Sequence, residues 1–346
     1  MSEERKKQVQ ALPKVELHLH LEGCATLATL RTLCRQNRKP LPVHLQDELA
    51  QTHVFGTFDE FVFSYQSICQ AITQEQDFAL LIADVADYLK RNTILYAEVA
   101  WTPFLYLNRG LHFEAIMEIM NEALIAHAIE DRVHFVIDIQ RDHGIEAGSW
   151  VYQQVFATSP KLRIAGVGLT GQEEGFPPSE YQALYSQARE HGLGVTAHAG
   201  EYGTPEDIWQ CVRALGVKRI GHGIRAVHDR ALLDYLAEQR IHLEICPTSN
   251  VRCLLLQLRR SFAPVSEPVT PIRTQLRCAD PCAPPRGHLA FMCFAQDQPV
   301  GHHDGPAHFL PADSTIGVVA TRRSICGFHD AYISSLFFLC SCIYMQ

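Results

Sequence analysis

Short runs rich in β-branched residues alternate with longer amphipathic stretches over the first 252 residues. Strands that alternate with helices pair in parallel, because each helix returns the chain to the same end of the sheet. A closed (β/α)8 barrel needs eight strands. The chain is thus predicted to be α/β, a (β/α)8 TIM-type barrel whose eighth strand is disrupted. Seven runs are strand-like: 15–21, 94–101, 133–139, 164–169, 194–198, 218–222 and 241–246.

The segments between these runs carry apolar residues at helical spacing. Thr204 is followed by Pro205 and, three residues past the cap, by Asp207, which predicts a capped helix start. Ser179, followed by Gln182, predicts a weaker capping box. The helical segments are 58–72, 77–91, 113–131, 180–191 and 206–215.

The composition changes after Arg252. Residues 253–346 hold nine of the 18 prolines and seven of the 12 cysteines. A segment this rich in proline is typical of a linker or of disordered chain. We therefore divide the chain into a barrel, 1–252, and a divergent Pro/Cys-rich tail, 253–346. Our hypothesis is that a shifted reading frame or alternative splicing produced the tail, and it fails if neither other frame of the coding DNA encodes an eighth strand.

Charge and hydropathy point away from nucleic acid and membrane partners. The net charge is −8, and lysine and arginine are scattered rather than gathered into a basic stripe. The N-terminal residues are polar, and no apolar stretch reaches the ~20 residues that a membrane-spanning helix needs. None of the five cysteines before residue 253 forms a CxxC pair, which favours reduced thiols. We expect a cytoplasmic protein.

Two histidines are separated by one residue in the first strand-like run. Alternation along a strand places His18 and His20 on the same face, where both imidazoles can reach one ion. An isolated His-x-His is as often a pair of solvent-facing side chains. In a second segment His198 ends a strand-like run, and Glu201 follows in the next loop.

Two further segments follow the ends of strand-like runs. His222 lies between two glycines, which leave its side chain unobstructed, and Gly171 lies in a glycine-containing loop after 164–169. Each segment alone fits an ordinary βα turn. Together with the histidines they lie at the C-terminal ends of candidate strands, where barrel enzymes assemble their sites. Three converging histidines and a carboxylate that is not a ligand indicate a catalytic metal site.

The segments PKVELHLHLEG (13–23), TAHAGE (196–201), RIGHG (219–223) and CPTSNV (246–251) resemble the adenosine/adenine deaminase family of zinc aminohydrolases. Weaker similarity occurs in AEVAWTP (97–103) and GLTGQEEGFP (168–177). The resemblance covers residues 1–252. It implies a (β/α)8 barrel, one Zn²⁺ ion as cofactor, and a small-molecule purine nucleoside or base as the partner.

The resemblance also implies roles for individual residues. His18, His20 and His198 match zinc ligands, and His20 also lies at the substrate position. Glu201 matches the residue that protonates the purine ring nitrogen N1, and His222 matches the residue that orients the attacking hydroxide.

Two more positions match substrate contacts of the family. Gly171 matches a backbone contact to the purine, and Glu22 stands where the family places an acid near the sugar of the substrate.

The sequence departs from the family where the eighth strand should supply a further zinc ligand. The family has an Asp-Asp-Pro motif there, and this chain has none. The nearest match, Cys278-Ala279-Asp280-Pro281, puts Ala279 at the ligand position and Asp280 at the substrate position. A further candidate group of metal donors is His302-His303-Asp304, which has no strand pattern around it. Loss of one carboxylate ligand weakens zinc binding, so we expect weak or absent activity.

The resulting prediction is zinc-dependent hydrolysis of adenosine to inosine and ammonia, impaired in this chain. Deamination of adenine or another 6-aminopurine is an alternative of the same class. A catalytically inactive, truncated homologue that binds a purine or a partner is an alternative of another class. A barrel hydrolase of cyclic amides is a third, although such enzymes usually carry a bridging lysine, for which this chain has no candidate.

Overall fold

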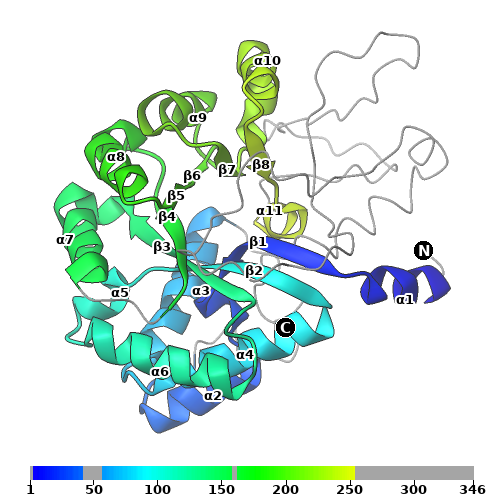
Figure 1. The fold of residues 1–346 in the computed structure, drawn as a ribbon, viewed down its shortest axis with the longest axis vertical. Coiled ribbons are helices and arrows are strands. Elements are labelled where there is room, and N and C mark those ends of the chain that lie inside the picture. The colour runs from blue at the N-terminus through cyan, green and yellow to red at the C-terminus, as the bar shows by residue number, and fades with distance from the viewer. Residues whose placement is uncertain (1–2, 42–56, 158–161, 254–346) are drawn as a thin grey trace.

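The structure, a computed structural model, describes residues 3–41, 57–157 and 162–253. Its strands lie at the centre and its helices surround them on the outside (Figure 1). All strand pairs are parallel and form two sheets, with the order β1-β2-β3-β4-β5 in one and β6-β7-β8 in the other. The predicted α/β TIM-type architecture is confirmed by this arrangement.

All seven predicted strands form, and the fifth is divided into two pieces. The interruption is at Thr196, whose backbone N–H still donates to the Val167 carbonyl at 3.0 Å. The two sheets are therefore parts of one curved layer. The strands are β1 Lys14–His20, β2 Ile94–Trp101, β3 Val133–Gln140, β4 Ile164–Thr170, β5 Gly194–Val195, β6 Ala197–Ala199, β7 Arg219–His222 and β8 His242–Glu244.

Helices follow the strands, as the spacing of apolar residues predicts. The main helices are α1 Glu3–Ala11, α2 Leu27–Gln36, α3 Phe58–Ala71, α4 Asp77–Arg91, α5 Phe104–Leu107, α6 Phe113–Ala126, α7 Gly144–Ala157, α8 Gln182–Glu190, α9 Pro205–Gln210, α10 Arg230–Glu238 and α11 Pro247–Arg252. Short turns of other helix types are η1 Glu22–Cys24, η4 Arg141–His143, η5 Pro178–Tyr181, η6 Cys211–Leu215 and η7 Ile224–His228. Within the described ranges, no helix has both the length and the apolar character needed to cross a bilayer.

Local signals at the helix ends were partly right. The capping box at Thr204 is present, with Asp207 accepting from the Thr204 backbone N–H at 2.7 Å. The capping box at Ser179 was wrong, because Ser179 lies inside η5 and α8 begins without a side-chain cap. The segment predicted to be helical to residue 131 ends at Ala126.

In the part of the chain that the structure describes, no strand follows β8. As a result β1 pairs only with β2, and β8 pairs only with β7. The disruption of the eighth strand stays a prediction, because that strand would follow residue 253. Asp280, the 302–304 group and the tail from residue 254 lie outside the described residues.

A buried arginine crosses the interior of the sheet layer and reaches both sides of that gap. Arg219 on β7 donates to Glu98 on β2 at 2.7 Å and to Glu244 on β8 at 2.5 Å. It also donates to the Leu17 carbonyl on β1 at 3.3 Å. The three charged side chains are at most 8% exposed, so their charges are compensated by one another rather than by water.

We expect Arg219→Met to lower the free energy of unfolding by about 3–5 kcal/mol, because two buried carboxylates lose their cation. Urea denaturation followed by circular dichroism measures the change. Arg163→Met is the matched control, since the Arg163–Asp131 pair is solvent-exposed and its loss is expected to cost ~1 kcal/mol or less. Equal effects of the two substitutions would contradict a structural role for the buried pair.

Candidate metal centre

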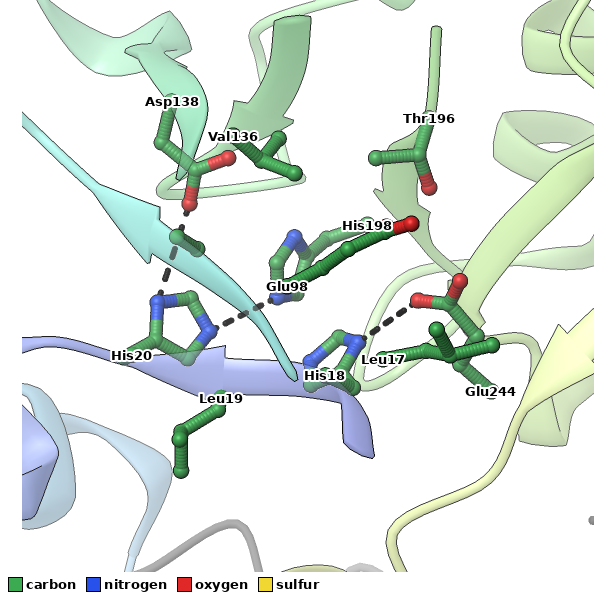
Figure 2. Close-up of a pocket in the computed structure, with 11 residues that line it drawn as sticks. Leu17, His18, Leu19, His20, Glu98, Val136, Asp138, Thr196, His198 and Glu244 are labelled. Carbon is green, nitrogen blue, oxygen red and sulfur yellow. Dashed lines mark hydrogen bonds and ion pairs between the residues drawn. The ribbon is translucent and has the colours of Figure 1, made fainter. Parts of the chain in front are cut away.

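Four imidazoles converge at the C-terminal ends of the strands. A ring nitrogen from each of His18, His198 and His222 lies within 4.8 Å of the other two. His20 joins this group, because its Nε2 lies 3.2 Å from Nε2 of His198 (Figure 2). The three predicted ligands and the predicted hydroxide-orienting residue are therefore neighbours in space, although β1 is far from β6 and β7 in sequence.

Gly221 gives the imidazoles the room to converge. In the strand register it lies between His198 on β6 and Glu244 on β8. A Cβ at this position would come within 2.8 Å of Cε1 of His18 and 3.3 Å of the His198 Cα. Any side chain here would push His18 out of the cluster, so the glycine of RIGHG is required by packing.

Two of the imidazoles face buried carboxylates through Nδ1. Glu244 lies 2.9 Å from Nδ1 of His18, and Asp138 lies 3.6 Å from Nδ1 of His20. Burial favours protonation of Glu244, but Arg219 and His18 outweigh it and lower its pKa to about 2. A carboxylate on one ring nitrogen leaves the other nitrogen available to a cation, which is the usual arrangement at metal-bound histidines.

His20, His198 and His222 of this cluster are neutral at pH 7. Burial, together with the neighbouring His18, lowers the pKa of His20 to about 3. Burial likewise holds the pKa of His198 and of His222 well below the usual range, with His18 adding to the effect. Neutral imidazoles are the form that binds metal ions, so no proton has to be removed first.

The geometry fits a tetrahedral metal ion. Metal–nitrogen bonds of ~2.0–2.1 Å put neighbouring nitrogens about 3.3 Å apart. The Nε2 atoms of His20 and His198 are 3.2 Å apart, close to that spacing. The donor set of neutral imidazoles suits zinc and similar transition metals better than magnesium or calcium.

Glu201 and His222 lie beside the imidazole cluster. Oε1 of Glu201 is 3.6 Å from Nε2 of His222, and both side chains are nearly inaccessible to solvent. His222 has a φ of 63°, a left-handed conformation that costs energy for a residue with a Cβ. Asn250 on α11 holds the ring with an amide contact of 2.9 Å to Nδ1. The strained backbone and the buried amide fix where this imidazole lies.

Glu173 is a supporting residue that the sequence reasoning missed. Its carboxylate accepts from the backbone N–H groups of Gly200 at 2.6 Å, Glu201 at 3.0 Å and Tyr202 at 3.2 Å. Its side chain is 2% exposed. These three hydrogen bonds anchor the loop that carries Glu201. The only sequence signal was its place in GLTGQEEGFP, which does not separate it from the neighbouring acid Glu174.

Glu22 is fully buried, and both of its oxygens are engaged. Oε1 accepts from the Tyr106 hydroxyl at 2.7 Å and Oε2 from the Tyr65 hydroxyl at 2.8 Å. Burial raises the pKa of Glu22. Gly171 comes directly after β4 with a φ of 92°, and its Cα faces Asp142, whose Oδ1 lies 2.0 Å from a Cβ built there.

We expect Glu173→Ala to lower the free energy of unfolding by about 3 kcal/mol, because buried N–H donors lose a charged acceptor. Amide hydrogen exchange at residues 200–202 should also become faster, since their acceptor is gone. Glu174→Ala is the matched control and is expected to change stability by no more than ~0.5 kcal/mol, because Glu174 is exposed. Unchanged exchange in Glu173→Ala would contradict the anchoring role.

Comparison with known proteins identifies relatives for most of the described chain. The family described as adenosine deaminase matches residues 13–267, which reaches past Arg252. The adenine deaminase of Crocosphaera subtropica is 32% identical over 249 residues, covering 71% of this chain and 76% of that relative. The adenine deaminase of Bordetella parapertussis is 33% identical over 251 residues, covering 70% and 77%.

Solved structures agree with these relatives. The crystal structure of adenine deaminase from Arthrobacter aurescens is 31% identical, with a TM-score of 0.65 over 71% of this chain and 75% of that chain. An amidohydrolase from Burkholderia ambifaria, solved with bound Zn, shares the fold at 22% identity, with a TM-score of 0.66 over 75% of this chain and 71% of that one. The histidine cluster is the candidate site of a metal cofactor. The chain belongs to the adenosine deaminase family, the hydrolytic deaminases of 6-aminopurines.

Proposed function

We propose that this chain is a zinc-dependent aminohydrolase of adenine. The observation that carries the proposal is the convergence of His18, His20 and His198 with Glu201 beside them. Three imidazoles and a carboxylate outside the ligand group form the donor pattern of a catalytic zinc site. Zinc in such a site activates water for attack at neutral pH.

His18, His20 and His198 are the proposed ligands of the ion. His222 lies within reach of the same point and contacts Glu201 at 3.6 Å, so it is suited to orient the attacking water rather than to complete the ligand set. The strained φ of 63° at His222 supports a functional role, because strain of this kind persists where the surrounding structure imposes it.

Glu201 is the proposed acid/base. Attack of water on the amino-bearing ring carbon places charge on the neighbouring ring nitrogen N1, and a protonated Glu201 relieves it by donating a proton there. The proton that water gives up passes to the amino group, the C–N bond breaks, and ammonia leaves. The hydroxyl left on the ring carbon becomes the carbonyl oxygen, and its proton returns to Glu201. Proton transfer by a positioned side chain contributes ~10²–10⁴ in rate.

The surroundings of Glu22 favour a free base over a nucleoside. Glu22 was predicted to lie near the sugar of the substrate, but Tyr65 and Tyr106 occupy both of its oxygens at 2.8 and 2.7 Å. Glu22 is fully buried, so a sugar hydroxyl would reach it only if one of these tyrosines moved. Adenine deaminases that are 32% and 33% identical to this chain support the same choice. The Gly171 backbone remains the proposed contact to the purine ring.

A second candidate is a homologue that binds zinc and purine without turnover. It is favoured by the sequence, which has no Asp-Asp-Pro motif to supply a further carboxylate ligand. Zinc stoichiometry and turnover on the same preparation separate the candidates. We expect zinc to bind and turnover to be weak, and near-normal turnover would contradict the expected impairment.

With zinc supplied, we expect kcat/KM for adenine to exceed that for adenosine by at least ~10-fold, because the fully buried Glu22 is out of reach of a sugar hydroxyl. Loss of absorbance at the purine band measures both reactions. A higher kcat/KM for adenosine would contradict the assignment of adenine and restore the nucleoside as substrate.

We expect Glu201→Gln to lower kcat by about 10²–10⁴, because the amide cannot donate the proton to N1. Zinc content should stay unchanged, since Glu201 is not a proposed ligand. Glu206→Gln is the matched control: Glu206 is exposed in α9, and we expect normal turnover. Loss of zinc in Glu201→Gln would instead make Glu201 a ligand.

A further inference from the structure

Asp138 on β3 is a buried carboxylate that no predicted role uses. It is 1% exposed, and its Oδ2 has no hydrogen-bond partner among the described residues. The ionisable group that faces it is the imidazole of His20, whose Nδ1 is 3.6 Å away (Figure 2). A carboxylate is kept out of water only at a cost, so a buried one with a single partner calls for an explanation.

The neighbouring strand is shaped to admit this carboxylate. Asp138 pairs with Gly168 in the register of β3 and β4. A Cβ on residue 168 would lie 2.0 Å from Oδ1 of Asp138, and no real structure tolerates such a contact. Gly168 has no positive φ, so the glycine is explained by the space that Asp138 occupies rather than by its backbone conformation.

Asp138 and the proposed ion lie on opposite edges of the His20 ring. Nδ1 faces Asp138, whereas Nε2 faces Nε2 of His198 at 3.2 Å. The two nitrogens of an imidazole point in divergent directions, so a carboxylate on the Nδ1 edge cannot ligate the ion that Nε2 binds. Asp138 therefore cannot replace the ligand that the eighth strand would supply.

The same arrangement occurs at His18, where Glu244 lies 2.9 Å from Nδ1. Both histidines of β1 thus have a buried carboxylate behind them, one from β8 and one from β3. Such a carboxylate fixes the ring and increases the basicity of the nitrogen that binds the metal.

We propose that Asp138, admitted by Gly168, is the positioning residue that orients His20 toward the metal ion. This inference rests on the proposed zinc site. It assigns to Asp138 no contact with substrate or metal, only control of a ligand through its second nitrogen.

The test is zinc affinity, measured by competition with a chromophoric chelator on the full chain. The isosteric Asp138→Asn is expected to weaken binding by about 10–100-fold, as losses behind metal-bound histidines usually do. Asp84→Asn is the matched control, since Asp84 is a buried carboxylate that caps α2 through Thr26 and lies away from the histidines in the fold. It should leave zinc affinity unchanged.

A second test moves the carboxylate from residue 138 to residue 168 and asks whether zinc affinity is recovered. In Asp138→Gly/Gly168→Asp the acid enters the same space from β4, and we expect it to regain most of the affinity that Asp138→Gly alone loses. Unchanged affinity in Asp138→Asn, an equal loss in Asp84→Asn, or a folded double variant without recovery would each overturn the proposal. A wild-type chain that binds no zinc would instead overturn the proposed function.

Discussion

The hydrogen bond between Glu244 and His18 joins the last described strand to the first, and the site depends on it. Glu244 can accept from the imidazole because Arg219 keeps it ionised, with a pKa of about 2. Arg219 in turn reaches Glu98 on β2. Arg219 therefore fixes the position of β8 relative to β2. Through Glu244 it also fixes the orientation of the His18 imidazole.

The ends of strands and the faces of their side chains could be predicted from the sequence. Alternation in 15–21 placed His18 and His20 on one face, and the structure has them there, because the period of a strand is a local property. Features that depend on neighbours distant in the sequence could not be predicted. The position of Asp138 opposite Gly168 becomes visible only when β3 is paired with β4. The role of Glu173 becomes visible only when residues 200–202 lie against it.

Glycines illustrate the same limit. From the sequence, the glycines around His222 were explained by an unobstructed side chain, and Gly168 was one residue of the strand-like run 164–169. In the structure Gly221 and Gly168 lie inside strands without positive φ, and each leaves space for a side chain from another strand. The space at Gly221 admits His18, and the space at Gly168 admits Asp138. Which side chain fills such a space depends on the strand register. The register relates two segments that are distant in the sequence, so neither segment alone predicts it.

The two sheets meet through the site itself. His20 belongs to the sheet of β1–β5 and His198 to the sheet of β6–β8, and their Nε2 atoms are 3.2 Å apart. An ion bound by both adds a cross-link between the sheets, which are also joined by the Arg219–Glu98 and Glu244–His18 contacts. Its binding free energy adds to folding, by about 2.7 kcal/mol at a hundredfold excess over Kd. Metal binding and the joining of the two sheets are thus coupled.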